Sequence, residues 1–145
     1  MKWLLLSAGK PALAYARSGR HEYLQRINHF AKFEHQTIKA SDPQRESSQF
    51  LDRSQGYRRL VLEEKGTQVT SRQLATKLDN WREAAIPVAV IIGWANGHHS
   101  SLIQAADFTW SLGTLTLQHE LALVIVLEQI YRAHTILQGH PYHRD

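Results

Sequence analysis

A run of five apolar residues, Val88–Ile92, constrains the fold of this chain more than any other feature. It contains no polar side chain, whereas a strand with one face in solvent alternates apolar and polar residues. Such a run is typical of a central parallel strand that helices cover on both faces. Parallel neighbours need crossover connections, and the rest of the chain alternates strand-like and helix-like segments. The sequence therefore predicts an α/β fold built on a mostly parallel sheet.

The remaining elements are predicted from periodicity and from start and stop signals. Thr70 can cap a helix that ends before Pro87. Ser41–Gln55 is polar and contains an Asp-Pro pair, so we expect a loop there with at most a short helix, and we expect a turn around Gly66. Further strands are expected at Lys2–Ser7, Phe33–Ala40, Arg59–Glu63 and Phe108–Leu112, and further helices at Ala12–Phe30, Leu102–Ala106 and Glu120–Leu137.

Length and composition limit what kind of protein this can be. Its 145 residues suit one domain. The chain has no cysteine, which excludes disulfides, thiolate zinc sites and a cysteine nucleophile, and agrees with a cytoplasmic location. The net charge of +4 suits a polyanionic partner, although an ordinary basic surface explains it equally well. The apolar runs Met1–Leu6 and Leu121–Leu127 are far shorter than the ~20 residues of a membrane span, so we expect neither a signal peptide nor a membrane partner.

The helix expected at Glu120–Leu137 is apolar nearly all round in its first two turns. Such a helix must be buried on more than one side. In a chain of this size, we expect another copy of the protein to cover the second side. The alternative is a helix at the centre of one protomer's core.

Several common catalytic motifs are absent from the sequence. There is no Gly-x-Gly-x-x-Gly after a strand, no phosphate loop ending in Gly-Lys-Ser/Thr and no His-Glu-x-x-His, which excludes the usual dinucleotide, NTPase and zinc-protease patterns. The adjacent His98 and His99 diverge on most backbones, and His140 and His143 have no acidic or cysteine company. We therefore expect no metal site.

Three segments are candidates for a functional site. Ile92–Gly97 follows the apolar strand, Leu112–Leu117 follows the last strand, and His140–Asp145 ends the chain. The first two lie where open α/β sheets bind ligands, outside the carboxyl ends of strands, and their glycines permit close approach of a cofactor. Leu115 and Leu117 can line an adenine. The tail carries an imidazole, a phenol and a guanidinium, which can take up a proton and hold a phosphate or a developing oxyanion.

The order and content of these segments resemble a known family. The matching residues are Trp110–Leu112, Leu115–Leu117 with His119, Glu128–Ala133 and His140–Arg144, with looser agreement at Gly9-Lys10, Glu22–Leu24, Arg26 and the strand ending at Leu62 before Gly66. They resemble the RlmH family, the 23S rRNA pseudouridine-N3 methyltransferases of the SPOUT superfamily. The resemblance spans essentially the whole chain and is densest towards the C-terminus.

The resemblance implies a fold and a cofactor. The implied fold is a SPOUT-type parallel sheet flanked by helices, with a deep trefoil knot at the C-terminal end. Residues 1–145 would form one SPOUT methyltransferase domain, with the knot at 88–137 and a catalytic tail at 138–145. The implied cofactor is S-adenosyl-L-methionine, held by three loops. Its expected contacts are Leu62, Gly93, Trp94, Gly97, Leu112, Gly113, Thr114, Leu115, Thr116, Leu117 and Gln118.

The resemblance also implies a homodimer in which the second copy's tail completes the active site. His143 is then the expected base or proton relay, Tyr142 orients the nucleoside, and Arg144 holds a phosphate or a carbonyl that gains charge. The implied substrate is large-subunit ribosomal RNA, methylated on N3 of a pseudouridine. Scattered basic residues such as Lys10 and Arg17 would contact its phosphates.

The cofactor loop departs from the family pattern at two positions. The family usually reads Gly-Gly-x-Glu-Gly, and here Trp94 replaces the second glycine and Asn96 replaces the acid. The Trp94 side chain can crowd the cofactor, point outward, or stack on an adenine or base. An alternative function is therefore a catalytically weakened SPOUT homologue that binds RNA or the ribosome without methylating it. A third possibility keeps the chemistry and changes the RNA target.

Overall fold

The computed structural model describes residues 2–94 and 97–145, so Asn96 lies outside the described residues. Within these residues, five strands form one sheet in the order β2-β1-β4-β3-β5, and every neighbouring pair is parallel. The predicted parallel α/β sheet is confirmed. The strands are β1 (Lys2–Ala8), β2 (Lys32–Ile38), β3 (Arg58–Gln68), β4 (Val88–Ile92) and β5 (Phe108–Ser111), and the helices are α1 (Ala14–Ile27), α2 (Pro43–Arg53), α3 (Ser71–Glu83), α4 (Ser100–Gln104) and α5 (His119–Leu137).

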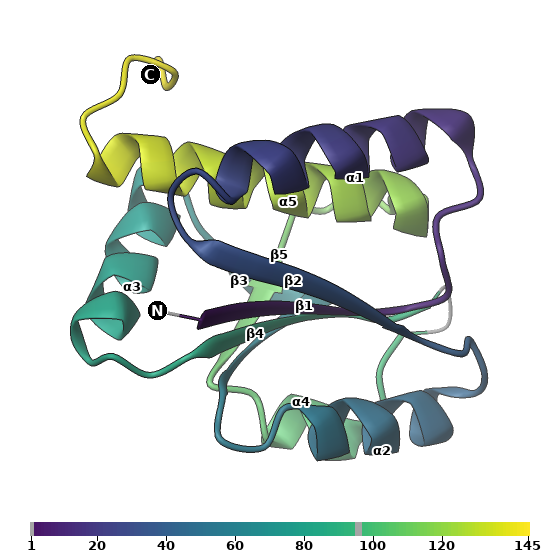
Figure 1. Ribbon diagram of the computed structural model, residues 1–145. Coiled ribbons are helices and arrows are strands. Elements are labelled where there is room, and N and C mark those ends of the chain that lie inside the picture. The colour runs from purple at the N-terminus through teal and green to yellow at the C-terminus, as the bar shows by residue number, and fades with distance from the viewer. Residues whose placement is uncertain (1, 95–96) are drawn as a thin grey trace.

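Helices cover the sheet on both faces (Figure 1). α1, α3 and α5 lie on one face, and α2 and α4 lie on the other. Alternate residues of β1 accordingly enter two separate hydrophobic clusters: Trp3 and Leu5 pack under the first group of helices, and Leu4 and Leu6 under the second. Every residue of β4 is buried, as its uniformly apolar sequence predicted.

α5 is buried mainly within its own protomer. It lies between α1 and α3 on the sheet, and its buried apolar residues are Ala122, Leu123, Val126, Leu127, Ile130, Tyr131 and Ala133. Leu121, in its first turn, remains 37% exposed. Most of α5 is therefore buried in the core of its own chain, which was the alternative to burial against a second copy.

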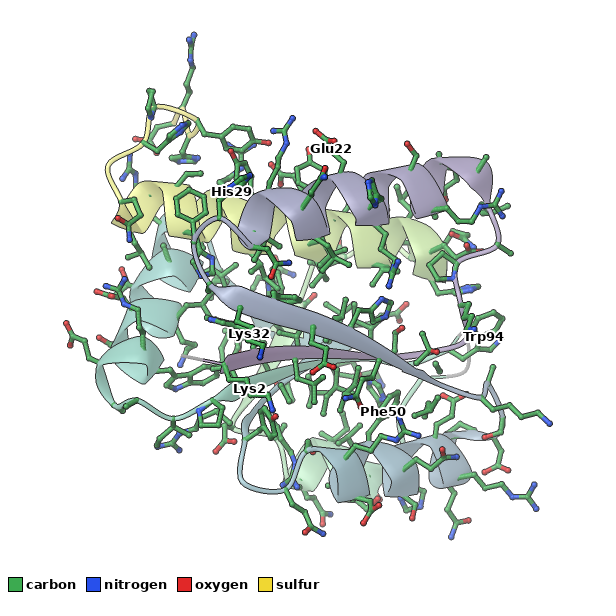
Figure 2. The ribbon with its side chains drawn as sticks, in the orientation of Figure 1. Lys2, Glu22, His29, Lys32, Phe50 and Trp94 are labelled. Carbon is green, nitrogen blue, oxygen red and sulfur yellow. The ribbon has the colours of Figure 1, made fainter. Side chains whose placement is uncertain are left out.

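Two sequence-based predictions are wrong. Ser41–Gln55 contains an 11-residue helix, α2, instead of a loop with at most a short helix. Its N-terminus is capped by Asp42, which accepts a hydrogen bond from the Arg45 amide at 2.9 Å, and Phe50 packs between α2 and the sheet (Figure 2). Gly66 lies inside β3 and not in a turn. A Cβ there would come within 2.7 Å of the Thr109 backbone, so glycine allows β3 to run on beside β5.

The structure leaves two features of the resemblance as predictions. These are the trefoil knot at 88–137 and the division of residues 1–145 into a single domain with a tail at 138–145. Among the residues that the structure describes, no helix is long and apolar enough to cross a membrane.

Candidate active site

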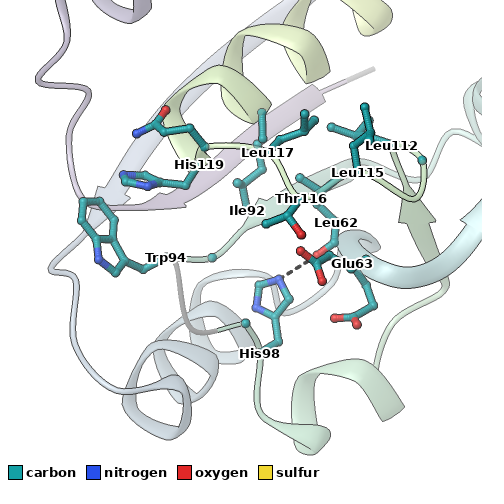
Figure 3. Close-up of a pocket in the computed structure, with 16 residues that line it drawn as sticks. Leu62, Glu63, Ile92, Trp94, His98, Leu112, Leu115, Thr116, Leu117 and His119 are labelled. Atoms are coloured by element: carbon teal, nitrogen blue, oxygen red, sulfur yellow. Dashed lines mark hydrogen bonds between the residues drawn. The ribbon is translucent and has the colours of Figure 1, made fainter.

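A pocket of about 530 Å³ opens where β4 and β5 end and where β3 passes Leu62 (Figure 3). Its volume lies within the range of 300–1,000 Å³ that is typical of small-molecule sites. It occupies the carboxyl edge of a parallel sheet, which is where such sheets bind ligands. The strand that supplies Leu62 changes its register with β5 at this point, between Leu62 and Thr67.

The loops named from the sequence meet around this pocket. The lining includes all but one of the residues expected to contact a cofactor, namely Leu62, Gly93, Trp94, Gly97, Leu112, Gly113, Leu115, Thr116, Leu117 and Gln118. Thr114 belongs to the same loop but is exposed and does not line the pocket. Gly113 has a φ of 130°, a conformation that favours glycine, and a Cβ there would meet nothing within 4 Å. That these residues bind a cofactor stays a prediction.

The pocket has two chemically different sides. Leu62, Leu112 and Leu115 lie on one side, and Trp94 and His119 lie on the other (Figure 3). Leucine side chains of this kind offer a flat base an apolar surface, while backbone groups can recognise its edge. The leucine side therefore suits an adenine ring.

The charged side chains of the described lining are Glu63 and Glu64. No lysine or arginine among the described residues lines the pocket, although the chain as a whole carries a net charge of +4. Carboxylates favour a cationic ligand and disfavour a polyphosphate. The pocket therefore suits a nucleoside that carries positive charge better than it suits a nucleotide.

His98 connects the loop after β4 to β3. Its Nε2 donates a hydrogen bond to the Leu62 carbonyl at 2.9 Å, and its ring occupies the space beside Gly93, where a Cβ would lie 2.7 Å from the ring. Burial lowers the pKa of His98, so the ring is neutral at pH 7. His98 therefore acts as a fixed donor that holds two walls of the pocket together.

Trp94 lies at the rim of the pocket and leaves the leucine side open. Its ring centroid is 3.8 Å from that of His119. One edge of the indole contacts Gly9, whose φ is 75°. A Cβ at Gly9 would lie 2.6 Å from Cζ3 of the indole. The side chain thus fills a slot between the turn after β1 and the start of α5, and it does not fill the space beside Leu112.

The C-terminal tail is held against the last turns of α5 and the start of α3. The Tyr142 hydroxyl donates to Glu128 at 3.0 Å, and Arg132 binds the same carboxylate at 2.6 Å. Arg132 also lies 3.1 Å from Nδ1 of His143, whose Nε2 is 3.0 Å from the Asp145 carboxylate. Burial, with hydrogen bonds to Tyr23 and Glu128, raises the pKa of Tyr142.

The last two residues of the tail are exposed. Arg144 is exposed, and Asp145 pairs with Arg72 at 2.8 Å. The hydrogen bond from Arg72 lowers the pKa of Asp145 to about 2, so its carboxylate is charged at any ordinary pH.

The structure does not bring the tail and the pocket together within one chain. The pocket lies at the N-terminal end of α5, beside His119, and the tail follows its C-terminal end (Figure 1). A helix of 19 residues is roughly 28 Å long. Tyr142 reaches back only as far as Glu128, which is nine residues, or roughly 14 Å, along the helix from His119. Tyr142, His143 and Arg144 do not line the pocket of their own chain.

Several lining residues were not among the cofactor contacts expected from the sequence: Glu63, Glu64, Ile92, His98, His119 and Ala122. The two glutamates directly follow the buried part of a predicted strand, so the rule that ligands bind beyond strand ends could have identified them. In the sequence, His98 is a candidate only for a metal site, which its adjacency to His99 disfavours. In the described parts of the chain, no group of three or more His, Cys, Asp or Glu side chains is placed to hold a metal ion.

Comparison with known proteins identifies the family. The family described as "Predicted SPOUT methyltransferase" matches residues 1–143. Ribosomal RNA large subunit methyltransferase H of Thermus thermophilus is 38% identical over 144 residues, which cover 99% of each chain. The protein of the same name from Deinococcus radiodurans is 37% identical over 145 residues, again with 99% coverage of both.

A solved structure supports the fold alone. A tRNA methyltransferase from Aquifex aeolicus superposes with a TM-score of 0.60 at 15% identity, over 100% of this chain and 76% of that one. The chain belongs to the SPOUT methyltransferases and, among them, to the family of ribosomal RNA large subunit methyltransferase H.

Proposed function

We propose that this protein is an S-adenosyl-L-methionine-dependent methyltransferase that methylates N3 of a pseudouridine in 23S ribosomal RNA. The observation that carries the proposal is the pocket at the carboxyl edge of the sheet, with leucines on one side and carboxylates in its wall. Relatives over the full chain are named ribosomal RNA large subunit methyltransferase H, which supports this substrate. The substrate implies a cytoplasmic location, where ribosomes are.

The residues present fit this cofactor. Leu112 and Leu115 would face its adenine, and Gly113 would allow the backbone to approach closely. Glu63 would lie near its positive charges, in a pocket whose described lining has no lysine or arginine. When bound, the cofactor supplies a methyl group that its positively charged sulfur already activates. The protein must therefore orient the acceptor base and remove its proton.

A second copy of the chain would bring these functions together. Four large apolar side chains are exposed at the end of α1 and α5 that lies beside the pocket. They are Leu13 and Tyr15 at the start of α1, Leu115 in the loop before α5, and Leu121 in the first turn of α5. A two-fold dimer buries the same patch on both copies. With α5 antiparallel to its counterpart, each tail would reach the pocket of the other copy.

Within such a dimer, the tail would serve the acceptor base. A side-chain N–H of Arg132 donates to Nδ1 of His143, and Nε2 of the same ring donates to Asp145, so the orientation of the ring is fixed. Once Arg132 has moved away from Nδ1, that nitrogen of His143 would accept the N3 proton. Tyr142 would orient the nucleoside, and Arg144 would hold a phosphate or carbonyl. We expect His143→Ala to lower turnover by roughly 100-fold or more, with unchanged affinity for S-adenosylhomocysteine. Unchanged turnover would remove His143 from this role.

Mass spectrometry of ribosomal RNA tests the target. In a strain that lacks this protein, we expect the 23S pseudouridine to lose one methyl group, and we expect the purified protein to restore it with S-adenosyl-L-methionine. Loss of a methyl group from another RNA would leave the chemistry in place and change the substrate.

The alternative is a weakened homologue that binds RNA without methylating it. The observation in its favour is that Trp94 and its neighbours narrow the rim of the pocket on the His119 side. Calorimetry with S-adenosylhomocysteine distinguishes the two functions, since an active enzyme must bind this product. The open leucine side favours binding.

A further inference from the structure

We propose that Glu46 and Ser47 of α2 are positioning residues for the loop that follows β4, and that they thereby set the affinity of the pocket for its ligand. Both residues lie outside the pocket lining. They belong to the segment that the sequence predicted as a loop, and they are among the least exposed polar residues of the chain, at 1% and 0%.

Two consecutive residues of α2 hold the two ends of this loop. The Glu46 carboxylate accepts hydrogen bonds from the amide of Ser41 at 2.8 Å and from the amide of Trp94 at 3.3 Å. The Ser47 hydroxyl accepts a hydrogen bond from the amide of His99 at 3.0 Å. Trp94 and His99 are therefore both bound to one rigid helical turn.

The residues between these contacts form part of the pocket. Gly97 and His98 line it, and His98 donates to the carbonyl of Leu62 on the opposite wall. A change in the loop would thus move both the rim at Trp94 and the wall at Leu62. Small displacements of binding groups are costly, because a pocket must be formed before the ligand arrives.

Covering the sheet does not explain these residue types. A helix that only packs on a sheet would carry apolar residues at its buried positions, as α2 does with Phe50. A buried carboxylate is unfavourable unless it is hydrogen-bonded. The partners of Glu46 and Ser47 include loop amides that would otherwise be unpaired, so their contribution lies in ordering the loop.

Ser54, which caps the C-terminus of α2, provides a matched control. It is also 0% exposed, and its hydroxyl donates to Phe50 at 2.7 Å and accepts from Arg59 at 2.7 Å. It makes no hydrogen bond to the described residues of the pocket loop. Ser54→Ala and Ser47→Ala therefore remove the same group from one helix, at its C-cap and at its middle.

Amide exchange in the free protein gives the first test. We expect Ser47→Ala to speed exchange at His99, and Glu46→Gln to speed it at Trp94, each roughly fivefold, with Ser54→Ala changing neither. Loss of one net hydrogen bond corresponds to about this factor. Unchanged exchange at both amides would overturn the proposal.

Calorimetry with S-adenosylhomocysteine, well below the melting temperature, gives the second test. We expect Ser47→Ala and Glu46→Gln each to raise Kd roughly fivefold. Ser54→Ala should lower the melting temperature about as much as these two variants do, and it should leave Kd unchanged. Equal effects of all three variants on Kd would show a purely structural role. This arm rests on the proposed function: if the unmodified protein does not bind, the proposed function fails, and exchange alone decides the role of α2.

Discussion

His35 should make the protein sensitive to mild acid. It lies in β2, where Arg20 donates a hydrogen bond to Nδ1 and Nε2 lies 2.7 Å from the Ser7 hydroxyl. An acceptor nitrogen facing an arginine carries no proton, so the ring is neutral and donates to Ser7. Burial, together with the positive charge of Arg20, lowers the pKa of His35 from 6.5 to about 4.

The sign and size of the effect follow from these two pKa values. Between pH 6.5 and about 4, His35 is protonated in the unfolded chain and neutral in the folded protein, so unfolding takes up a proton. The free energy of unfolding therefore falls as pH falls through this window, and the loss from this residue ends below about pH 4. Each pKa unit corresponds to about 1.4 kcal/mol, so His35 accounts for about 3 kcal/mol between pH 7 and pH 4.

Urea denaturation at pH 7, 5.5 and 4 measures this effect. In His35→Gln the side chain can still accept from Arg20 and donate to Ser7 but cannot titrate. We expect the unmodified protein to lose about 3 kcal/mol more than the variant between pH 7 and pH 4. Burial also lowers the pKa values of His98 and His134, which are present in both proteins and cancel in the difference. The same pH dependence in both proteins would refute the assignment.

Two further predictions concern the pocket. Gly9→Ala should lower the free energy of unfolding by at least about 1–2 kcal/mol, because φ at Gly9 is 75° and the new Cβ would displace Trp94. Thermal denaturation measures this change, and an unchanged melting temperature would contradict the packing of Trp94 on Gly9. Glu63→Gln should weaken binding of S-adenosyl-L-methionine roughly threefold to tenfold in calorimetry. It should weaken binding of S-adenosylhomocysteine less, because the sulfur of that product carries no charge. Equal losses of affinity for both ligands would exclude an electrostatic interaction between Glu63 and the sulfonium.

Much of the pocket was predictable because its position depends on strand direction. Gly93 and Gly113 follow strands that the sequence predicted, and the carboxyl ends of parallel strands meet at one edge. The sequence predicted that the residues of the tail act together in a functional site. Their position against α5 depends on contacts with Glu128 and Arg132, and no local sequence pattern indicates those contacts. Whether the tail acts on the pocket depends on a second copy and stays a prediction.

α2 shows why the rest of the site was missed. The Asp42-Pro43 pair is a helix start signal, but the polarity of the segment around it predicted a loop. Glu46 and Ser47 resemble surface residues in the sequence, yet they are buried because their partners lie about 50 residues further along the chain. Periodicity counts apolar side chains, so it does not detect a face buried through hydrogen bonds.

The sequence by itself determined that Val88–Ile92 is a central strand and that strands alternate with helices in a parallel sheet, because these features depend on each residue's neighbours along the chain. Only the tertiary structure decided that β3 continues past Gly66, that Trp94 fits between Gly9 and His119, and that Glu46 of α2 binds the amide of Trp94 after β4. Those outcomes depend on which distant segments pack together, and the contacts that settle them are made only when the sheet and its helices have assembled.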